Sequence, residues 1–148
     1  MSSTSVAAVL AFAAGLGGAV QVAVLGRLGE RVGSLEALTT TAVIGVLFAL
    51  VVLLVARRSL VGVGEAITGP KWLLLGGVLG ACIVLAVTIA GPRIGVVATT
   101  AFLIAGQLGL AALIDRFGWL GVERAPLSSA RAVGMVLLLA GALLTLRR

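Results

Sequence analysis

Five long apolar runs occupy most of this 148-residue chain. Four of them have about 20 residues, and a helix of that length, rising about 1.5 Å per residue, crosses a hydrocarbon core of about 30 Å. The composition agrees, since 61% of residues are hydrophobic, 11% are charged and the mean hydropathy is +1.27. The sequence therefore predicts an all-α integral membrane protein, with residues 1–148 as one domain and spans at residues 6–25, 37–56, 72–91, 94–114 and 128–146.

The first and last runs need separate arguments. Residues 1–5 contain no Lys or Arg, so the first run lacks the basic start of a signal peptide and is expected to be a retained span. Between Arg131 and Arg147 the fifth run has only about 22 Å of helix. We therefore expect this helix to begin earlier, near Leu127 or Ser128, just after Pro126.

The connections between the runs differ in length. Gly91-Pro92-Arg93 is so short that the third and fourth helices are expected to be antiparallel neighbours joined by a turn there. Residues 26–35 and 57–71 form longer connections with interfacial charges, and residues 61–67 are expected to form a short helix at the bilayer surface. Trp72 and Trp119 are expected to lie in the headgroup region.

The basic residues are divided almost evenly between the two sides of the membrane. With five spans, six of the eleven Lys and Arg residues fall on the N-terminal side and five on the other. Orientation normally follows a clear excess of these residues on the cytoplasmic side, so the even division predicts insertion in both directions. Two oppositely inserted copies would form an antiparallel homodimer of ten helices with inverted topology. The alternative is one orientation, set by a single dominant segment.

Small residues suggest close helix packing. Gly76 and Gly80 form a GxxxG pattern in the third run. Gly134 and Gly141 are seven residues apart on one face of the fifth helix, and we expect them to pack between subunits. The single cysteine, Cys82, is expected to be a packing residue.

Polar side chains inside the apolar runs are the candidate binding residues. Burying such groups in hydrocarbon costs free energy unless a cavity or a partner compensates. The candidates for substrate binding are Gln21, Thr41, Thr100 and Gln107. The glutamines serve either a pocket or hydrogen bonding between helices, and the sequence leaves both possibilities open.

Charged residues are absent from the middle of every run. The nearest carboxylates are Glu30 and Glu36, beside the start of the second run, and Asp115, at the end of the fourth. Asp115 precedes Arg116, so an interfacial ion pair between them is the simplest interpretation, and a gating or coupling role for Asp115 and Glu36 is the alternative. No nucleophile–base pair, metal-ligand cluster or phosphate loop occurs, so we expect no enzyme activity, metal or cofactor. The basic residues lie at span ends, which argues against nucleic-acid binding.

The chain resembles the YdcZ-like family of proposed inner-membrane exporters, within the drug/metabolite transporter superfamily. The second half carries the most specific matches: Pro92-Arg93-Ile94-Gly95, Ala105-Gly106-Gln107-Leu108, Asp115-Arg116-Phe117-Gly118, Pro126-Leu127, Gly134 and Gly141. The first half adds Gln21, Arg27-Leu28-Gly29, Gly45, Gly76-Gly77 and Gly80. The chain departs from the family pattern at Leu25, where many members carry Asn, and at Thr41, where others carry Ser or Asn.

The resemblance implies five spans in the bacterial inner membrane, occurrence as dual-topology homodimers, opposed pairs or fused ten-span forms, and a transport role. The expected function is therefore a small secondary transporter that exports small polar or amphipathic metabolites or drugs by alternating access. Its expected partners are membrane lipid, a second copy in the opposite orientation and a small-molecule substrate. The alternative is a non-transporting membrane subunit or a lipid-interacting scaffold.

Overall fold

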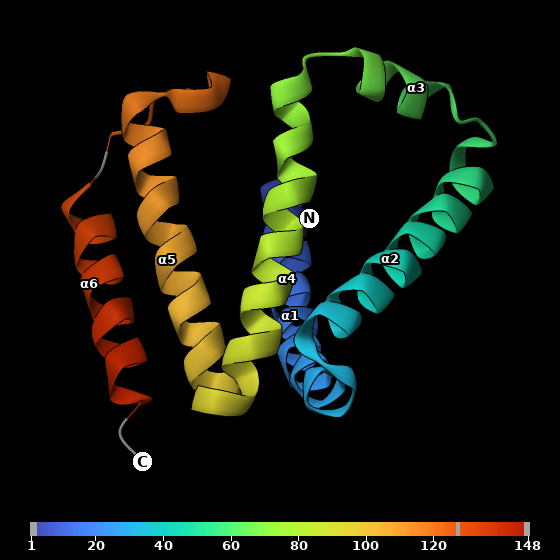
Figure 1. Cartoon of the computed structure of the whole chain (residues 1–148). Helices are drawn as coiled ribbons and strands as arrows, with labels where there is room; N and C mark the ends of the chain where they lie inside the picture. The colour runs from blue at the N-terminus through green and yellow to red at the C-terminus, as the bar shows by residue number, and fades with distance from the viewer. Residues whose placement is uncertain (1–2, 127, 147–148) are drawn as a thin grey trace. The chain divides into compact units, whose positions relative to one another are not determined.

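The computed structural model describes residues 3–126 and 128–146, which are almost entirely helical (Figure 1). The elements are α1 (Ser3–Val32), α2 (Ser34–Arg57), α3 (Val61–Thr68), η1 (Lys71–Leu74), α4 (Leu75–Ile94), α5 (Val96–Phe117), η2 (Trp119–Gly121) and α6 (Ser129–Leu144). Within the described residues, α1, α2, η1 with α4, and α5 are long and apolar enough to cross a membrane, and α6 is a shorter apolar helix. The prediction of an all-α membrane protein is confirmed at this level.

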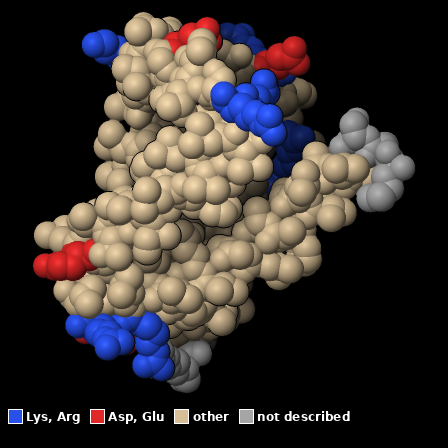
Figure 2. Space-filling model, turned by 90° about the vertical axis from the view of Figure 1, so that its right-hand side faces the viewer, with Lys and Arg blue, Asp and Glu red and all other residues tan. Residues whose placement is uncertain are grey.

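The chain is apolar on its surface as well as inside. Large hydrophobic side chains are exposed along every long helix, for example Phe12 at 71%, Phe48 at 70% and Val55 at 77%. Figure 2 shows one face of the molecule, on which uncharged side chains form a broad surface and charged ones gather in a few places at its edges. Such a surface is favourable in contact with lipid or with another apolar chain, and unfavourable in contact with water.

The first connection is much shorter than expected. The chain remains helical through residues 26–32, and the break is at Gly33, which has φ 99°. The expectation of a long connection over residues 26–35 was wrong. The charged residues and glycines of this stretch, unlike a proline, can continue a helix. Gly33 alone supplies the positive φ that most other residues avoid.

The turn between α4 and α5 also lies elsewhere than expected. Pro92 and Arg93 are inside the last turn of α4, and the helix breaks at Gly95, which has φ 85°. A proline removes one backbone hydrogen bond, and near a helix end the carbonyl left free can be satisfied in another way. The turn predicted at Gly91–Arg93 was therefore placed too early.

The described chain divides into two compact units. We call residues 24–92 the central unit and residues 1–23 with 93–148 the terminal unit. In the central unit, the end of α1 lies against the end of α4. A Cβ built on Gly26 would lie 3.3 Å from Cδ of Pro92, and one built on Gly29 would overlap Cγ2 of Thr88. Thr88 is 1% exposed, and its hydroxyl donates to the Val84 carbonyl at 2.7 Å.

The same contact involves the backbone group that the proline inside α4 leaves without its helical hydrogen bond. The carbonyl that Pro92 cannot bond is that of Thr88, one turn earlier. It faces Gly29, since a Cβ built there would lie 3.5 Å from the Thr88 oxygen. The Cα–H of Gly29 is thus directed toward this carbonyl, an arrangement of the kind that contributes a weak hydrogen bond between helices.

The remainder of the central unit follows the sequence more closely. The short helix predicted at residues 61–67 is present as α3. It is connected through η1 to α4, and Arg58, with φ 51°, ends α2 in the left-handed conformation.

In the terminal unit, α5 and α6 lie side by side (Figure 1). Gly118, with φ 67°, ends α5, and the following loop folds back so that the Ala125 amide donates to the Asp115 carbonyl at 2.9 Å. Phe117 and Trp119 stack with ring centroids 5.2 Å apart. The loop thereby returns the chain to the side of α5 for the start of α6.

The start of α6 agrees with the prediction. Ser128 is the N-cap, and its hydroxyl accepts from the Arg131 amide at 3.3 Å, which satisfies one of the free donors of the first turn. Leu127, the other expected start, lies outside the described residues.

Candidate binding groove between α5 and α6

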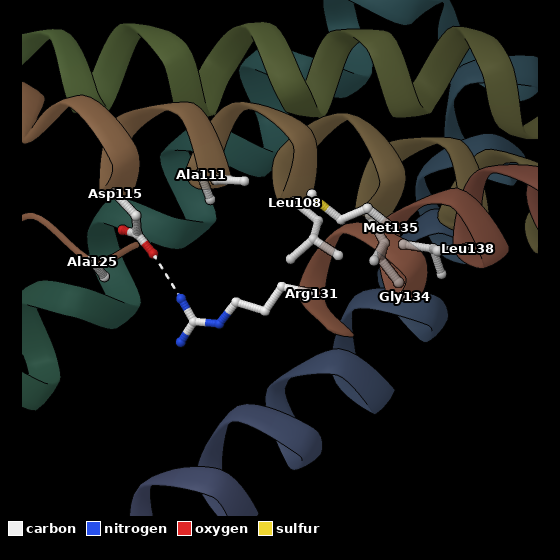
Figure 3. Close-up of a pocket in the computed structure, with 10 residues that line it drawn as sticks. Leu108, Ala111, Asp115, Ala125, Arg131, Gly134, Met135 and Leu138 are labelled. Atoms are coloured by element: carbon white, nitrogen blue, oxygen red, sulfur yellow. Dashed lines mark ion pairs between the residues drawn. The ribbon is translucent and has the colours of Figure 1, made fainter. Parts of the chain in front are cut away.

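A groove of about 630 Å³ lies along the contact between α5 and α6 in the terminal unit (Figure 3). We call it the α5–α6 groove. Its apolar lining comes from Ile104, Leu108, Ala111 and Ala112 of α5, Ala125 of the loop, and Gly134, Met135 and Leu138 of α6. Asp115 and Arg131 are the charged residues of its lining.

The groove exists because small side chains face each other across the helix contact. Ala111 and Ala112 of α5 and Gly134 of α6 leave space that longer side chains would fill. A Cβ built on Gly134 meets no described heavy atom within 4 Å. Met135 and Leu138 of α6 and Ile104 and Leu108 of α5 line the rest of the groove, so the hollow is bounded by apolar walls.

One end of the groove is formed by an ion pair between the two helices. The Arg131 guanidinium lies 3.9 Å from the Asp115 carboxylate, and the two side chains point toward one another (Figure 3). The Arg131 side chain is 60% exposed and the Asp115 side chain 42%. A pair this exposed contributes no more than about 1 kcal/mol to stability. The expected pair between Asp115 and Arg116 was wrong, because successive residues on a helix point in different directions.

A second groove, of about 490 Å³, lies on another side of the same helix contact. Ala105, Gly109 and Ala112 of α5 line it together with Ala132, Met135, Val136 and Leu139 of α6. Arg116 is the charged residue of its lining, and no carboxylate belongs to that lining. Asp115 and Arg116 thus point into different grooves, as their positions on the helix require.

The four residues predicted to bind substrate are divided between the two units. Gln21, Thr100 and Gln107 belong to the terminal unit and Thr41 to the central unit. Both glutamines are exposed, Thr41 is half-buried, and none of the four lines either of the two grooves. Their assembly into one pocket stays a prediction.

Thr100 differs from the other buried threonines of the long helices, Thr88 and Thr99. Its hydroxyl oxygen is buried, yet it has no hydrogen-bond partner among the described residues. Its neighbour Thr99, 4% exposed, donates to the Gly95 carbonyl at 2.8 Å, and Thr39 donates to the Leu35 carbonyl at 2.9 Å. Bonding one turn back is the usual way for a threonine to be satisfied within a helix, and Thr100 does not use it.

The other predicted residues lie at helix ends or on open faces. Glu36 is in the first turn of α2, where its carboxylate lies over Gly33 and where, with Leu35, Thr39 and Thr40, it borders a shallow surface hollow. Gly134 lines the α5–α6 groove, while Gly141 is exposed and, like Gly134, has no described heavy atom within 4 Å of a built Cβ. Packing of these glycines against a second subunit stays a prediction.

Arg131 is the charged residue of this site that the sequence did not assign, and the apolar lining residues other than Gly134 were not assigned either. From the sequence, Arg131 is only a basic residue near a span end. The available signal was the presence of opposite charges at neighbouring ends of two consecutive helices, which antiparallel packing brings together. Among the described residues, no group of His, Cys, Asp and Glu is arranged to hold a metal ion.

Long apolar helices with charges at their ends define a multi-pass membrane protein. A family model described as "Putative inner membrane exporter, YdcZ" matches residues 6–144, and the chain belongs to this family. It is therefore a multi-pass protein of the inner membrane, in a family described as a transporter rather than as an enzyme. Searches of curated proteins and of solved structures gave no match.

Proposed function

We propose that this chain is a small secondary transporter of the drug/metabolite transporter superfamily, exporting small polar or amphipathic metabolites or drugs. In this proposal α6 is the fifth span, and two copies inserted in opposite directions form an antiparallel homodimer of ten helices. Alternating access results from one copy rocking against the other around a shared polar pocket.

The observation that carries the proposal is the set of unsatisfied polar groups in apolar helices. Gln107 is exposed on α5 seven residues after Thr100, nearly two full turns, so both lie on the same side of the helix. Neither side chain has a hydrogen bond among the described residues, and the same holds for Gln21 on α1. Polar groups in hydrocarbon need partners, and a bound substrate or the second copy would supply them. Thr41 is assigned to the same pocket.

The dimer is supported by two further observations. The near-even division of Lys and Arg gives neither orientation an advantage, although Arg147 and Arg148 lie outside the described residues. Gly134 and Gly141 leave space on α6 for another helix to approach. A second copy would also cover part of the exposed apolar surface.

We assign gating to the charged helix ends. Asp115 and Arg131 connect α5 to α6 through a partly exposed pair with an N–O distance of 3.9 Å, which is weak enough to break and reform during a transport cycle. Glu36 also lies at a helix end, in the first turn of α2 beside the α1–α2 break. Neither residue is assigned contact with the substrate.

The pocket is tested by a pair of neighbouring threonines together with Gln107. In a thermal-shift screen of purified protein against small polar and amphipathic compounds, a ligand that stabilises the wild-type chain should lose its effect in Gln107→Leu and Thr100→Val. Thr99→Val is the matched control, because the Thr99 hydroxyl is already bonded to Gly95. Equal stabilisation in all three variants would remove Gln107 and Thr100 from the pocket and favour the scaffold interpretation.

Dual insertion is tested separately in cells. A cysteine at position 148 (Arg148→Cys in a Cys82→Ala background) should be labelled from both sides of the membrane by an impermeant maleimide, in comparable fractions. Labelling from one side only would contradict insertion in both directions.

A further inference from the structure

We propose that the α5–α6 groove binds a membrane phospholipid with an ethanolamine head group. One acyl chain would lie along the apolar walls, and the zwitterionic head would lie at Asp115 and Arg131. This site is separate from the polar pocket of Gln107 and Thr100, and the proposal stands whether or not the chain transports a substrate.

The length of the groove matches the depth of one leaflet. It extends along α5 from Ile104 to Asp115, a rise of about 16 Å for helical residues. Half of a hydrocarbon core of about 30 Å is about 15 Å. The apolar part of the groove therefore reaches from a helix end, where charged residues lie, to about the middle of the bilayer. An acyl chain of one leaflet covers the same distance in the same direction.

The lining of the groove suits a single flexible chain. Between Ile104 and the ion pair, the walls are aliphatic side chains, a methionine, alanines and Gly134. No aromatic residue and no hydrogen-bonding side chain belongs to this part of the lining. Recognition here can depend only on shape and on apolar contact, which a hydrocarbon chain provides.

The ion pair provides the specificity for the head group. The Arg131 and Asp115 side chains are 3.9 Å apart, beyond hydrogen-bond distance, and among the described residues neither has another polar partner. Arg131 therefore retains donors that match a phosphate, and Asp115 retains acceptors that match a primary ammonium. A phosphoethanolamine head carries both groups. A choline head has no N–H to donate to Asp115, and a purely anionic head has no ammonium to balance the charge of this carboxylate.

The second groove supports this choice by contrast. Its charged residue is Arg116 and no carboxylate belongs to its lining, so nothing there would select an ammonium group. The two grooves lie on the same pair of helices and share Ala112 and Met135. They differ in charge, which makes the second groove an internal control for the first.

The proposal can be tested by native mass spectrometry of the purified full-length chain. The protein is titrated with phosphatidylethanolamine, phosphatidylcholine or phosphatidylglycerol of identical acyl composition, and the lipid-bound fraction is measured. Phosphatidylethanolamine should bind about tenfold more tightly than the other two. Asp115→Asn should reduce its affinity about tenfold and bring it to the level of phosphatidylcholine, as expected for the loss of one charge-assisted hydrogen bond. Arg131→Gln should weaken all three lipids, and Arg116→Gln should leave the preference unchanged.

A steric variant decides the outcome independently of the ion pair. Ala111→Leu places a larger side chain in the α5–α6 groove and should displace the lipid, whereas Ala105→Leu, in the second groove, should not. Helix content measured by circular dichroism verifies that each variant is folded. Equal binding of the three lipids to the wild-type chain, an unchanged preference in Asp115→Asn, or unchanged lipid binding in Ala111→Leu would each overturn the proposal. Gln107→Leu should retain the lipid, so failure of the substrate pocket and failure of the lipid site are distinguishable.

Discussion

The two helix contacts of this chain use small residues in opposite ways. In the central unit, Gly26 and Gly29 of α1 receive Pro92 and Thr88 of α4, so the helices approach closely at these positions. In the terminal unit, Ala111 and Ala112 of α5 share the contact with Gly134 of α6, and a groove remains. A small residue therefore gives close helix packing where a side chain of the opposite helix fills the space beside it, as Pro92 and Thr88 do.

This difference explains why small-residue patterns alone predict packing poorly. Gly76 and Gly80 form the GxxxG pattern of α4, yet a Cβ built on either meets no described heavy atom within 4 Å. Gly29 belongs to no small-residue packing pattern identified in the sequence, and its built Cβ overlaps Thr88. Close packing of another helix against Gly76 and Gly80 stays a prediction.

The largest effect is expected at the closed contact. Gly29→Ala should destabilise the chain by about 1–3 kcal/mol, as overpacking does elsewhere. Thr88 cannot rotate away without breaking the bond of its hydroxyl to the Val84 carbonyl. The measurement is thermal or denaturant unfolding in detergent. Thr88→Ser, which removes the overlapping methyl group and keeps the hydroxyl, should restore most of the loss in the double variant. If Gly29→Ala proves neutral, the central contact is looser than described.

An intermediate effect is expected in the loop that leads to the groove. Gly118 and Gly121 both have positive φ, 67° and 80°, but only Gly118 is crowded, with Cγ of Arg124 2.7 Å from a built Cβ. Gly121→Ala should cost about 1–2 kcal/mol for the left-handed conformation alone.

Gly118→Ala should cost more than Gly121→Ala, because Arg124 must also move. Comparison of the two unfolding midpoints separates conformational strain from crowding. Equal losses in the two variants would show that Arg124 gives way freely, and the loop would then hold the groove less firmly than the contact suggests.

The smallest effect is expected beside the second groove. A Cβ built on Gly109 meets nothing within 4 Å, so Gly109→Ala should change the unfolding free energy by no more than about 0.5 kcal/mol. Alanine also favours helix over glycine, which offsets small losses. The same unfolding assay applies. A loss as large as that of Gly29→Ala would mean that the α5–α6 contact is as closed as the central one, and the comparison would fail.

The sequence predicted the helices well and their ends less well. Hydropathy placed every long helix, and Pro126 followed by Ser128 placed the start of α6, because capping depends on local chemistry. The α1–α2 and α4–α5 breaks were misplaced. Each occurs at one glycine with positive φ, Gly33 and Gly95, and nothing local distinguishes these from the glycines that remain helical. The sequence placed Asp115 and Arg131 at neighbouring helix ends but did not establish that they pair, because the pair depends on how α6 returns beside α5.

The amino-acid sequence by itself determined that this is a helical membrane protein, because hydropathy and span length follow from composition along the chain. Its motifs and the family model that matches residues 6–144 place it in the YdcZ family. The sequence also supplied the polar residues that we assign to transport. Only the tertiary structure decided which small residues close a contact and which border a groove. That outcome depends on the side chain opposite each of them, Thr88 for Gly29 and open space for Gly134, and residues far apart in the chain become opposite only when the helices pack.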